Sequence, residues 1–348
     1  MLNQLFHLPD GLLNLSADAL HEELGGPTLI HLEGQRQPAL FVSVLMHGNE
    51  TVGWEAVREL LRKYTVGGGE QPLPRSLSLF IGNTAAAAVN LRNLPTQPDY
   101  NRVWPGSEPA STAEHGLMQE VVDCMASRGV FASVDVHNNT GLNPHYACLN
   151  AIRTETLHLA AMYSRTVVYF TRPLGVQSIA MTRLCPSVTL ECGKVGQAYG
   201  VEHALEYLSA CLHLAEHPRN PIAHGDIDLF HTVAIVRVPA DVSFGFGCDD
   251  RDLCLLENLE HLNFRELPTG TIFGLAGSLL DIPFDVLNEE DMNVGGRFFE
   301  LDQAQIKTRT PLMPSMLTRD ETVIRQDCLC YLMERYDAHL TEAEHAAD

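Results

Sequence analysis

The feature that most constrains this fold is an alternation of short apolar segments with amphipathic ones along the first two thirds of the chain. Apolar runs rich in Val, Ile, Leu and Phe, the composition of buried strands, occupy residues 39–45, 77–81, 131–136, 166–170 and 187–190. Apolar residues recur at helical spacing in 51–64, 114–127 and 154–164, and a further helix is expected at 201–216. Strands that alternate with helices predict an α/β sheet with a large parallel component.

The character of the chain changes at residues 217–225, a segment rich in Pro, Gly and polar side chains that has the composition of a linker. After it, short β segments are broken by Gly and Pro, and no long amphipathic helix is expected before Thr322. We therefore expect two domains, 1–220 and 225–340, of which the second is smaller and β-rich. The polar end of the chain, 342–348, is expected to be frayed.

The charge and cysteine content narrow the classes of partner. The chain carries 23 basic and 44 acidic residues, a formal net charge of -21, and nucleic acid binding draws on clustered Lys and Arg that it lacks. No apolar run reaches the roughly eighteen residues of a membrane helix. The nine cysteines include no C-x-x-C pair, which fits a reduced compartment. We expect a cytoplasmic protein that binds neither nucleic acid nor membrane, and homo-oligomer formation is left open.

His47 and Glu50 are the sharpest chemical feature, because they follow the first strong apolar segment directly in Met46-His-Gly-Asn-Glu50. In open α/β folds ligands bind at the carboxyl edge of the sheet. A His and a Glu three residues apart can converge on one metal from a turn. The alternative is a helix N-terminus in which Glu50 only favours the helix dipole.

His137 follows a second apolar segment in the same way and supports the metal interpretation. Asp135, two residues earlier, can accept the other imidazole proton and orient the ring. Two His and one Glu form a catalytic zinc set whose fourth position stays open. His145 is a rival ligand in the same region, and the remaining histidines are assigned structural roles.

Glu191 ends a third apolar segment and precedes Cys192-Gly-Lys194. A carboxylate at this position, before a glycine that lets the backbone turn, suits a general base beside a metal site. The alternative is a surface glutamate paired with Lys194.

Two arginines lie in the loops between these strand ends, Arg92 and Arg102, the second directly after Asn101. A guanidinium offers a planar donor fork suited to a carboxylate or a developing oxyanion. Burying two arginines without anionic partners would be costly. The alternative is a pair of solvated loop arginines.

Together these segments resemble the succinylglutamate desuccinylase and aspartoacylase family, itself related in fold to the zinc carboxypeptidases. The resemblance covers residues from about 40 to 195 and rests on His47-Gly-Asn-Glu50, Asn83 with Arg92, Asn101-Arg102, Asp135-Val-His137-Asn and Thr189-Leu-Glu191-Cys-Gly193. It implies an α/β fold with a zinc carboxypeptidase-like mixed sheet flanked by helices and a smaller C-terminal β-rich domain.

The resemblance also implies roles for individual residues. His47, Glu50 and His137 would hold one zinc ion per chain. Glu191 would act first as general base and then as general acid. The reaction would be hydrolysis of an N-acyl amino acid to a carboxylate and a free amine.

For the substrate, a small molecule with a carboxylate, the resemblance implies that Arg92 polarises the scissile carbonyl. Asn101 and Arg102 would grip the substrate carboxylate.

Two departures from the family pattern concern the substrate. Where the family has an arginine that helps to bind an anionic substrate group, alignment of the shared Ser-Ile-Ala places Gln177, with Arg172 and Arg183 as substitutes. The substrate-contacting tyrosine of the C-terminal domain falls near Met292. A pocket that has lost charge in this way should disfavour N-acetylaspartate and N-succinylglutamate.

The sequence therefore predicts a zinc-dependent amidohydrolase. The first alternative is a metallocarboxypeptidase that acts on the C-terminal residue of a peptide. The second is a non-catalytic binding protein on the same scaffold, which would be marked by loss of Glu191 or of a ligand. A serine hydrolase is disfavoured because the chain contains no G-x-S-x-G motif.

Overall fold

The computed structural model describes residues 2–65, 71–107, 112–223, 225–247, 250–277 and 281–336, so the tail 342–348 lies outside the described residues. The chain divides into two compact units. The first holds Met1–Asn138 and His145–Asp228, and the second holds Asn139–Pro144 and Leu229–Asp348.

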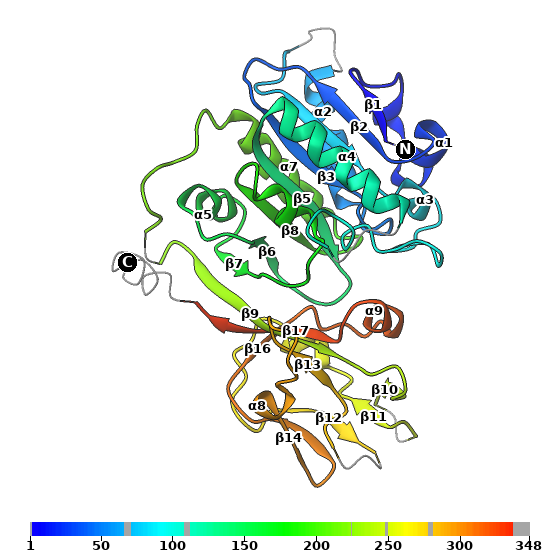
Figure 1. Cartoon of the computed structure of the whole chain (residues 1–348), viewed down its shortest axis with the longest axis vertical. Helices are drawn as coiled ribbons and strands as arrows, with labels where there is room; N and C mark the ends of the chain where they lie inside the picture. The colour runs from blue at the N-terminus through cyan, green and yellow to red at the C-terminus, as the bar shows by residue number, and fades with distance from the viewer. Residues whose placement is uncertain are drawn as a thin grey trace. The chain divides into compact units, whose positions relative to one another are not determined.

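The first unit is built on one sheet whose strands follow the order β1-β2-β4-β3-β5-β8-β6-β7 (Figure 1). The strands are β1 (Asn3–Leu5), β2 (Thr28–Leu32), β3 (Ala39–Val44), β4 (Leu77–Ile81), β5 (Val130–Asn139), β6 (His145–Leu149), β7 (Thr166–Tyr169) and β8 (Ser187–Lys194). β3 pairs in parallel with both β4 and β5, whereas β2 with β4 and β6 with β8 are antiparallel. The sheet is therefore mixed, and the expected fold class is confirmed.

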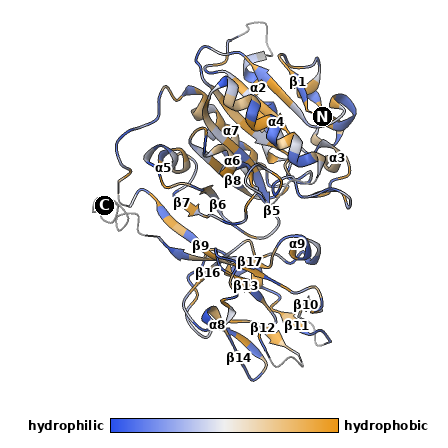
Figure 2. Ribbon diagram, viewed as in Figure 1, coloured by the Kyte–Doolittle hydropathy of each residue, from blue (hydrophilic) through white to orange (hydrophobic). Residues whose placement is uncertain are grey.

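Helices cover both faces of this sheet. They are α1 (Leu20–Leu24), α2 (Val52–Thr65), α3 (Thr84–Ala87), α4 (Ala113–Arg128), α5 (Thr154–Ala161), α6 (Gln177–Met181) and α7 (Ala198–His213). Hydrophilic and hydrophobic residues alternate along α4 (Figure 2), and its apolar side packs in one cluster with Phe41 and Phe80 of the sheet. On the other face α2 packs against α7 and approaches β3 closely at Gly53, where an added Cβ would lie 2.9 Å from Val44 Cγ1.

Two strands run further than the apolar pattern predicts. β5 continues to Asn139 and β8 to Lys194, so His137 and Glu191 lie inside strands rather than just after them. The reason is pairing, since β6 continues the ladder with β8 as far as Cys192. Backbone pairing extends a strand through polar residues that the apolar pattern excludes.

At the amino edge of the sheet, two arginines bind the carbonyl groups that the end of α7 leaves without helical partners. Arg36 Nη1 donates to the carbonyl of His213 at 2.9 Å. Arg75 Nη2 donates to the carbonyls of Leu214 and Ala215 at 2.9 and 3.1 Å. Cationic groups at a helix C-terminus also complement its dipole, so this arrangement fixes the end of α7 to the sheet.

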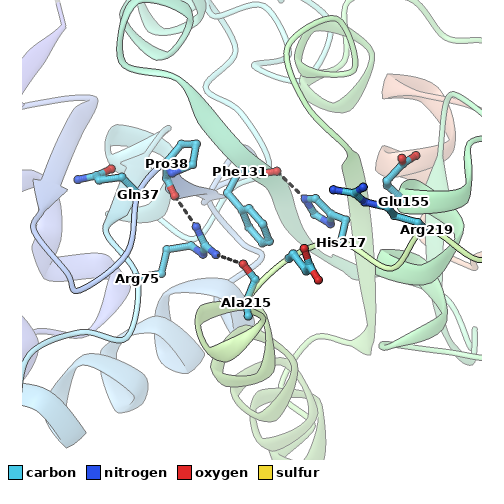
Figure 3. Close-up of a pocket in the computed structure, with 9 residues that line it drawn as sticks. Gln37, Pro38, Arg75, Phe131, Glu155, Ala215, His217 and Arg219 are labelled. Carbon is cyan, nitrogen blue, oxygen red and sulfur yellow. Dashed lines mark hydrogen bonds between the residues drawn. The ribbon is translucent and has the colours of Figure 1, made fainter.

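The guanidinium of Arg75 also lies over the ring of Phe131, 3.5 Å from the centroid, and the side chain of Arg75 is buried. The imidazole of His217 stacks on the same ring at 4.1 Å. Figure 3 shows Phe131 between Arg75 and His217, beside a cavity of about 370 Å³. The segment that follows α7 is thereby held by stacking as well as by hydrogen bonds.

The second unit is mainly β-structure. Its strands are β9 (Asp228–Arg237), β10 (Phe244–Phe246), β11 (Leu253–Leu255), β12 (Ile272–Ala276), β13 (Asp285–Leu287), β14 (Phe299–Asp302), β15 (Gln305–Thr308), β16 (Met313–Ser315) and β17 (Cys330–Arg335). β9 pairs antiparallel with β13 and β17, and β10-β11-β12-β15-β14 form a separate sheet. A core that includes Val236, Phe273 and Phe299 fills the unit, and its helices α8 (Gly295–Phe298) and α9 (Glu321–Gln326) are short.

Of the helices that the structure describes, none combines the length and apolar composition needed to cross a membrane.

Candidate metal centre

His47, Glu50 and His137 come together at the carboxyl edge of the sheet in the first unit. Each is buried and offers one ligand atom, and these atoms lie within 4.8 Å of one another. Glu50 Oε1 is 2.8 Å from His47 Nδ1, and Glu50 Oε2 is 2.8 Å from His137 Nδ1. Two imidazole nitrogens and a carboxylate that converge in this way match the donor set of a catalytic zinc site.

The turn that carries His47 and Glu50 depends on the glycine between them. A Cβ on Gly48 would lie 2.2 Å from Ala87 N and 2.4 Å from Ala86 C. Because these are backbone atoms, the overlap could be removed only by a shift of the backbone. The Gly48 N–H donates to the carbonyl of Arg92 at 2.9 Å. Close packing of this turn against α3 and the following loop therefore fixes the ligand-bearing segment.

His137 is held from behind by a carboxylate, as the sequence predicts. Asp135 Oδ2 lies 2.8 Å from His137 Nε2, and Asp135 Oδ1 accepts from Ser43 Oγ at 2.6 Å. Burial alone would lower the pKa of His137, but the negative charges of Asp135 and Glu50 outweigh it and raise this pKa well above the usual value. A carboxylate therefore faces each nitrogen of this ring.

The pKa of Glu50 is shifted in the opposite direction to that of His137. Burial alone would raise its pKa, but the charges of His47 and His137 hold that pKa far below its ordinary value. The N–H of Asn138 also donates to Glu50 Oε2 at 3.1 Å. The carboxylate is thus ionised and available as a ligand.

The nitrogen of His47 that does not face Glu50 also contacts a carboxylate, that of Asp99. The sequence assigned no role to Asp99. Asp99 Oδ1 lies 2.9 Å from His47 Nε2. Burial would raise the pKa of Asp99, but the charges of His47 and Arg92 hold it well below the ordinary value. The only sequence signal was the position of Asp99 in the loop that leads to Asn101 and Arg102.

Arg92 lies in the site rather than in solvent, which removes the alternative of a solvated loop arginine for this residue. Its side chain is 10% exposed, its Nη2 is 3.0 Å from Asp99 Oδ2, and its Nη1 is 3.5 Å from Glu50 Oε1. The guanidinium therefore lies beside the metal-ligand cluster, with anionic partners for its charge.

Glu191 is buried at 8% exposure, so the alternative of a surface glutamate is wrong. Burial raises its pKa to about 8, the negative charges of Glu50 and Asp135 add to this, and the positive charges of His137 and Arg92 oppose it. These electrostatic couplings show that the carboxylate shares its surroundings with the cluster. A carboxylate with a raised pKa can both accept and return a proton near neutrality.

Asn101 and Arg102 lie next to the cluster, but the amide of Asn101 is already engaged by the protein. Its Oδ1 accepts from the N–H of Gln177 at 2.8 Å, and its Nδ2 lies 3.4 Å from Asp135 Oδ2 and 3.2 Å from His137 Nε2. Arg102 Nη1 donates to the carbonyl of Asn101 at 2.8 Å. A substrate role for these two residues stays a prediction.

The interpretation of Gln177 as a pocket residue is wrong. Its side chain is fully buried, and Nε2 donates to Ser133 Oγ at 2.8 Å. Gln177 is the first residue of α6, and it packs that helix onto β5 rather than facing a ligand. Its identity therefore says nothing about the charge of an acyl pocket.

The rival ligand His145 lies outside the cluster of possible ligands found among the described residues. Its Nδ1 is 2.8 Å from His203 Nδ1, and its ring stacks on Tyr199 with the centroids 4.4 Å apart. His145 thus belongs to an aromatic stack that includes α7.

Asn138 belongs to the quoted motif Asp135-Val-His137-Asn, but the sequence assigned it no role of its own. Its Oδ1 accepts from the N–H of Val52 at the start of α2, and its Nδ2 donates to the carbonyl of Gly193, both at 3.2 Å. It joins the ends of β5 and β8 to the helix that follows Glu50. Asn83 is a helix cap, whose Oδ1 accepts from Ala86 N at 3.1 Å.

Comparison with known families identifies the family of this chain. Residues 36–213 match the model of the succinylglutamate desuccinylase/aspartoacylase catalytic domain, which is just over half of the chain. The chain belongs to this family. The family consists of deacylases that hydrolyse amide bonds, and the matched segment contains the whole metal-ligand cluster together with Glu191.

Solved structures with a similar fold include three deacylase-family enzymes. Succinylglutamate desuccinylase from Chromobacterium violaceum is 18% identical with a TM-score of 0.59, covering 89% of this chain and 88% of that one. Succinylglutamate desuccinylase/aspartoacylase from Rhodobacter sphaeroides is 15% identical with a TM-score of 0.57, covering 89% of both. Murine aminoacylase 3 is 13% identical with a TM-score of 0.56, covering 87% and 97%. At these identities the likeness establishes the fold. No curated protein matches the sequence.

Proposed function

We propose that this protein is a zinc-dependent amidohydrolase that cleaves the amide bond of an N-acyl amino acid. The observation that carries the proposal is the buried convergence of His47, Glu50 and His137, with ligand atoms within 4.8 Å of one another, in the same surroundings as the buried Glu191. One zinc ion per chain is the metal that this donor set favours. The catalytic domain would comprise residues 1–220, and residues 225–340 would form the second domain.

The chain's own residues divide the work of hydrolysis. When bound, a zinc ion supplies Lewis acidity and lowers the pKa of a neighbouring water. Glu191 accepts the proton of the attacking water and returns a proton to the departing amine. Arg92 stabilises the negative charge that develops on the carbonyl oxygen, and its anchoring by Asp99 keeps it in place before the reaction begins.

We infer a small substrate that carries a carboxylate next to the scissile amide. Arg102 binds this carboxylate, because a guanidinium can form two parallel hydrogen bonds with it. Asn101 orients Arg102 through its carbonyl, which accepts from Arg102 Nη1. The names of the similar structures, a desuccinylase and an aminoacylase, support removal of an acyl group as the reaction class.

The test is a screen of N-acyl amino acids and short peptides with the zinc-loaded enzyme, in which released amine is measured. We expect hydrolysis of at least one N-acyl amino acid. Glu191→Gln is the matched control, because its amide cannot accept a proton, and it should lower kcat by about a hundredfold or more while zinc stays bound. Activity on peptides alone would replace the proposal with a metallocarboxypeptidase, and a fully active Glu191→Gln variant would remove Glu191 from the mechanism.

A further inference from the structure

The cavity beside Phe131 lies at the amino edge of the sheet in the first unit, whereas the metal ligands lie at the carboxyl edge (Figure 3). Its walls come from the loop before β3, from β5 and α5, and from the segment that follows α7. Its volume is about 370 Å³. Cavities that hold small molecules measure about 300 to 1,000 Å³, so this one has the size for a small ligand.

One wall of the cavity presents a hydrogen-bond acceptor without a partner. His217 Nε2 lies 2.8 Å from the carbonyl oxygen of Phe131 and donates to it. In a neutral imidazole the other nitrogen is then an acceptor. This atom, Nδ1, is buried and has no hydrogen-bond partner within the part of the chain that the structure describes. Because a buried acceptor without a donor is costly, an N–H group on a ligand would stabilise this wall.

Charged side chains of both signs line the same cavity. Glu155 on α5 and Glu216 after α7 supply carboxylates, and Arg219 supplies a guanidinium. Glu216 and Arg219 are exposed. Among the described residues, none forms a salt bridge with any of these three side chains. Their charges are therefore available to a ligand.

A ligand with charge of one sign does not suit this lining. A simple anion would face the two glutamates, and a simple cation would face Arg219 together with the buried Arg75. A zwitterion avoids both conflicts. Its ammonium group can donate to the imidazole and to the glutamate carboxylates, while its carboxylate accepts from the guanidinium of Arg219.

We propose that this cavity binds a free α-amino acid with a small apolar side chain. Arg75 and His217 cover the two faces of the Phe131 ring, so the apolar side chain of the ligand lies against the edge of that ring and against Pro38. The site is separate from the metal centre, and the inference goes beyond the proposed function and does not depend on it. An α-amino acid is also the class of amine that the proposed hydrolysis releases.

Binding at this site would join segments that are far apart in sequence. Glu155 lies on α5, Arg219 lies beyond the end of α7, and Phe131 lies on β5. A ligand that contacts all three segments binds the folded chain and not the unfolded one. It should therefore raise the unfolding temperature of the protein.

The first measurement is isothermal titration calorimetry of the zinc-loaded wild-type protein with three related compounds. They are L-leucine, 4-methylpentanoate, which lacks the ammonium group, and 3-methylbutylamine, which lacks the carboxylate. We expect saturable binding of leucine that is at least about tenfold tighter than binding of either relative. Equal affinity for 4-methylpentanoate would make this an anion site, equal affinity for 3-methylbutylamine would make it a cation site, and either result, or no binding of leucine, would overturn the proposal.

The second measurement places the leucine in the cavity. Arg219→Gln and Glu216→Gln should each weaken leucine binding by about tenfold or more and reduce the rise in unfolding temperature that leucine causes. Both side chains are exposed, so the variants should fold. Arg165→Gln, which changes another exposed arginine of the first unit, is the matched control and should leave leucine binding unchanged.

Leucine held at the metal centre would give a different pattern. Its binding would be lost in Arg102→Ala and kept in Arg219→Gln, and that result would overturn the proposal. Because leucine binding is measured without hydrolysis, absence of N-acyl amino acid hydrolysis would refute the proposed function and leave this test intact.

Discussion

At the scale of single residues, the two histidines of the cluster each have one nitrogen on Glu50 and the other on an aspartate. The rings are therefore oriented before any metal arrives, and little reorganisation is needed on binding. Such preorganisation favours tight binding.

The first prediction concerns the ligands. His47→Ala and His137→Ala should each reduce bound zinc from about one per chain to well below half, because two remaining protein ligands hold zinc poorly. Elemental analysis of purified protein decides this. His145→Ala is the matched control and should keep its zinc, and full metal content in both ligand variants would mean that the metal lies elsewhere.

The second prediction concerns the ionisation of Glu191 in the metal-free protein. Burial raises its pKa from 4.5 to about 8, so the unfolded chain loses this proton at a lower pH than the folded chain. The folded state is then progressively destabilised as pH rises through that interval. Glu191→Gln cannot ionise. The difference in unfolding temperature, variant minus wild type, should therefore increase from pH 5 to pH 8, with both proteins treated with chelator. A constant difference across this range would contradict the raised pKa.

A third prediction concerns substrate binding. Arg102→Ala should raise KM, or lower kcat/KM, by about a hundredfold for every substrate, because a desolvated carboxylate would lose its charged partner. Steady-state kinetics on two N-acyl derivatives of different amino acids would measure this. The exposed Arg165→Ala serves as control, and an unchanged kcat/KM in Arg102→Ala would assign the carboxylate to another residue.

At the scale of elements, the metal centre depends on how tightly one turn packs. Gly48→Ala should destabilise the protein by about 1–3 kcal/mol and reduce its zinc content, since the new methyl group would overlap backbone atoms of Ala86 and Ala87. Thermal unfolding and elemental analysis measure both effects. Gly116→Ala is the matched control, because a Cβ there meets nothing within 4 Å inside α4, and it should stabilise the protein by about 0.5–1 kcal/mol. A Gly48→Ala protein as stable as the wild type would show that the turn can relax.

The sequence predicted the elements that bring the ligands together, because the apolar segments before His47, His137 and Glu191 end at one edge of a sheet. The strand 77–81 has the bounds of β4. The sequence could not predict contacts between residues that lie far apart along the chain. The pairing of Asp99 with His47 spans 52 positions, and the full burial of Gln177 follows from how α6 packs on β5. Neither leaves a periodic signal in the chain.

At the scale of the whole molecule, the two edges of the sheet in the first unit differ. The chemical edge carries the metal ligands, and the structural edge carries the contacts of Arg75 and Phe131. The ligands gather where the parallel strands β3 and β5 end, whereas Arg75 and Phe131 lie where β4 and β5 begin. A disturbance at the structural edge should therefore change stability more than catalysis.

The last prediction follows from that separation. Arg75→Ala should lower the free energy of unfolding by about 2–4 kcal/mol, because three carbonyl groups and the Phe131 ring lose a buried cationic partner. The kcat per folded molecule should stay near the wild-type value. Chemical denaturation and kinetics measure the two quantities, with Arg165→Ala as a control that should change stability by less than about 0.5 kcal/mol. A large loss of kcat in a folded Arg75→Ala protein would show that the two edges are coupled.

The hydrogen bond from Arg36 to the carbonyl of His213 joins the first and last residues of the segment that matches the family, at 2.9 Å. The two ends of the matched segment thus meet at one corner of the first unit, away from the metal ligands. Ends that lie this close together are the arrangement in which circular permutation is tolerated.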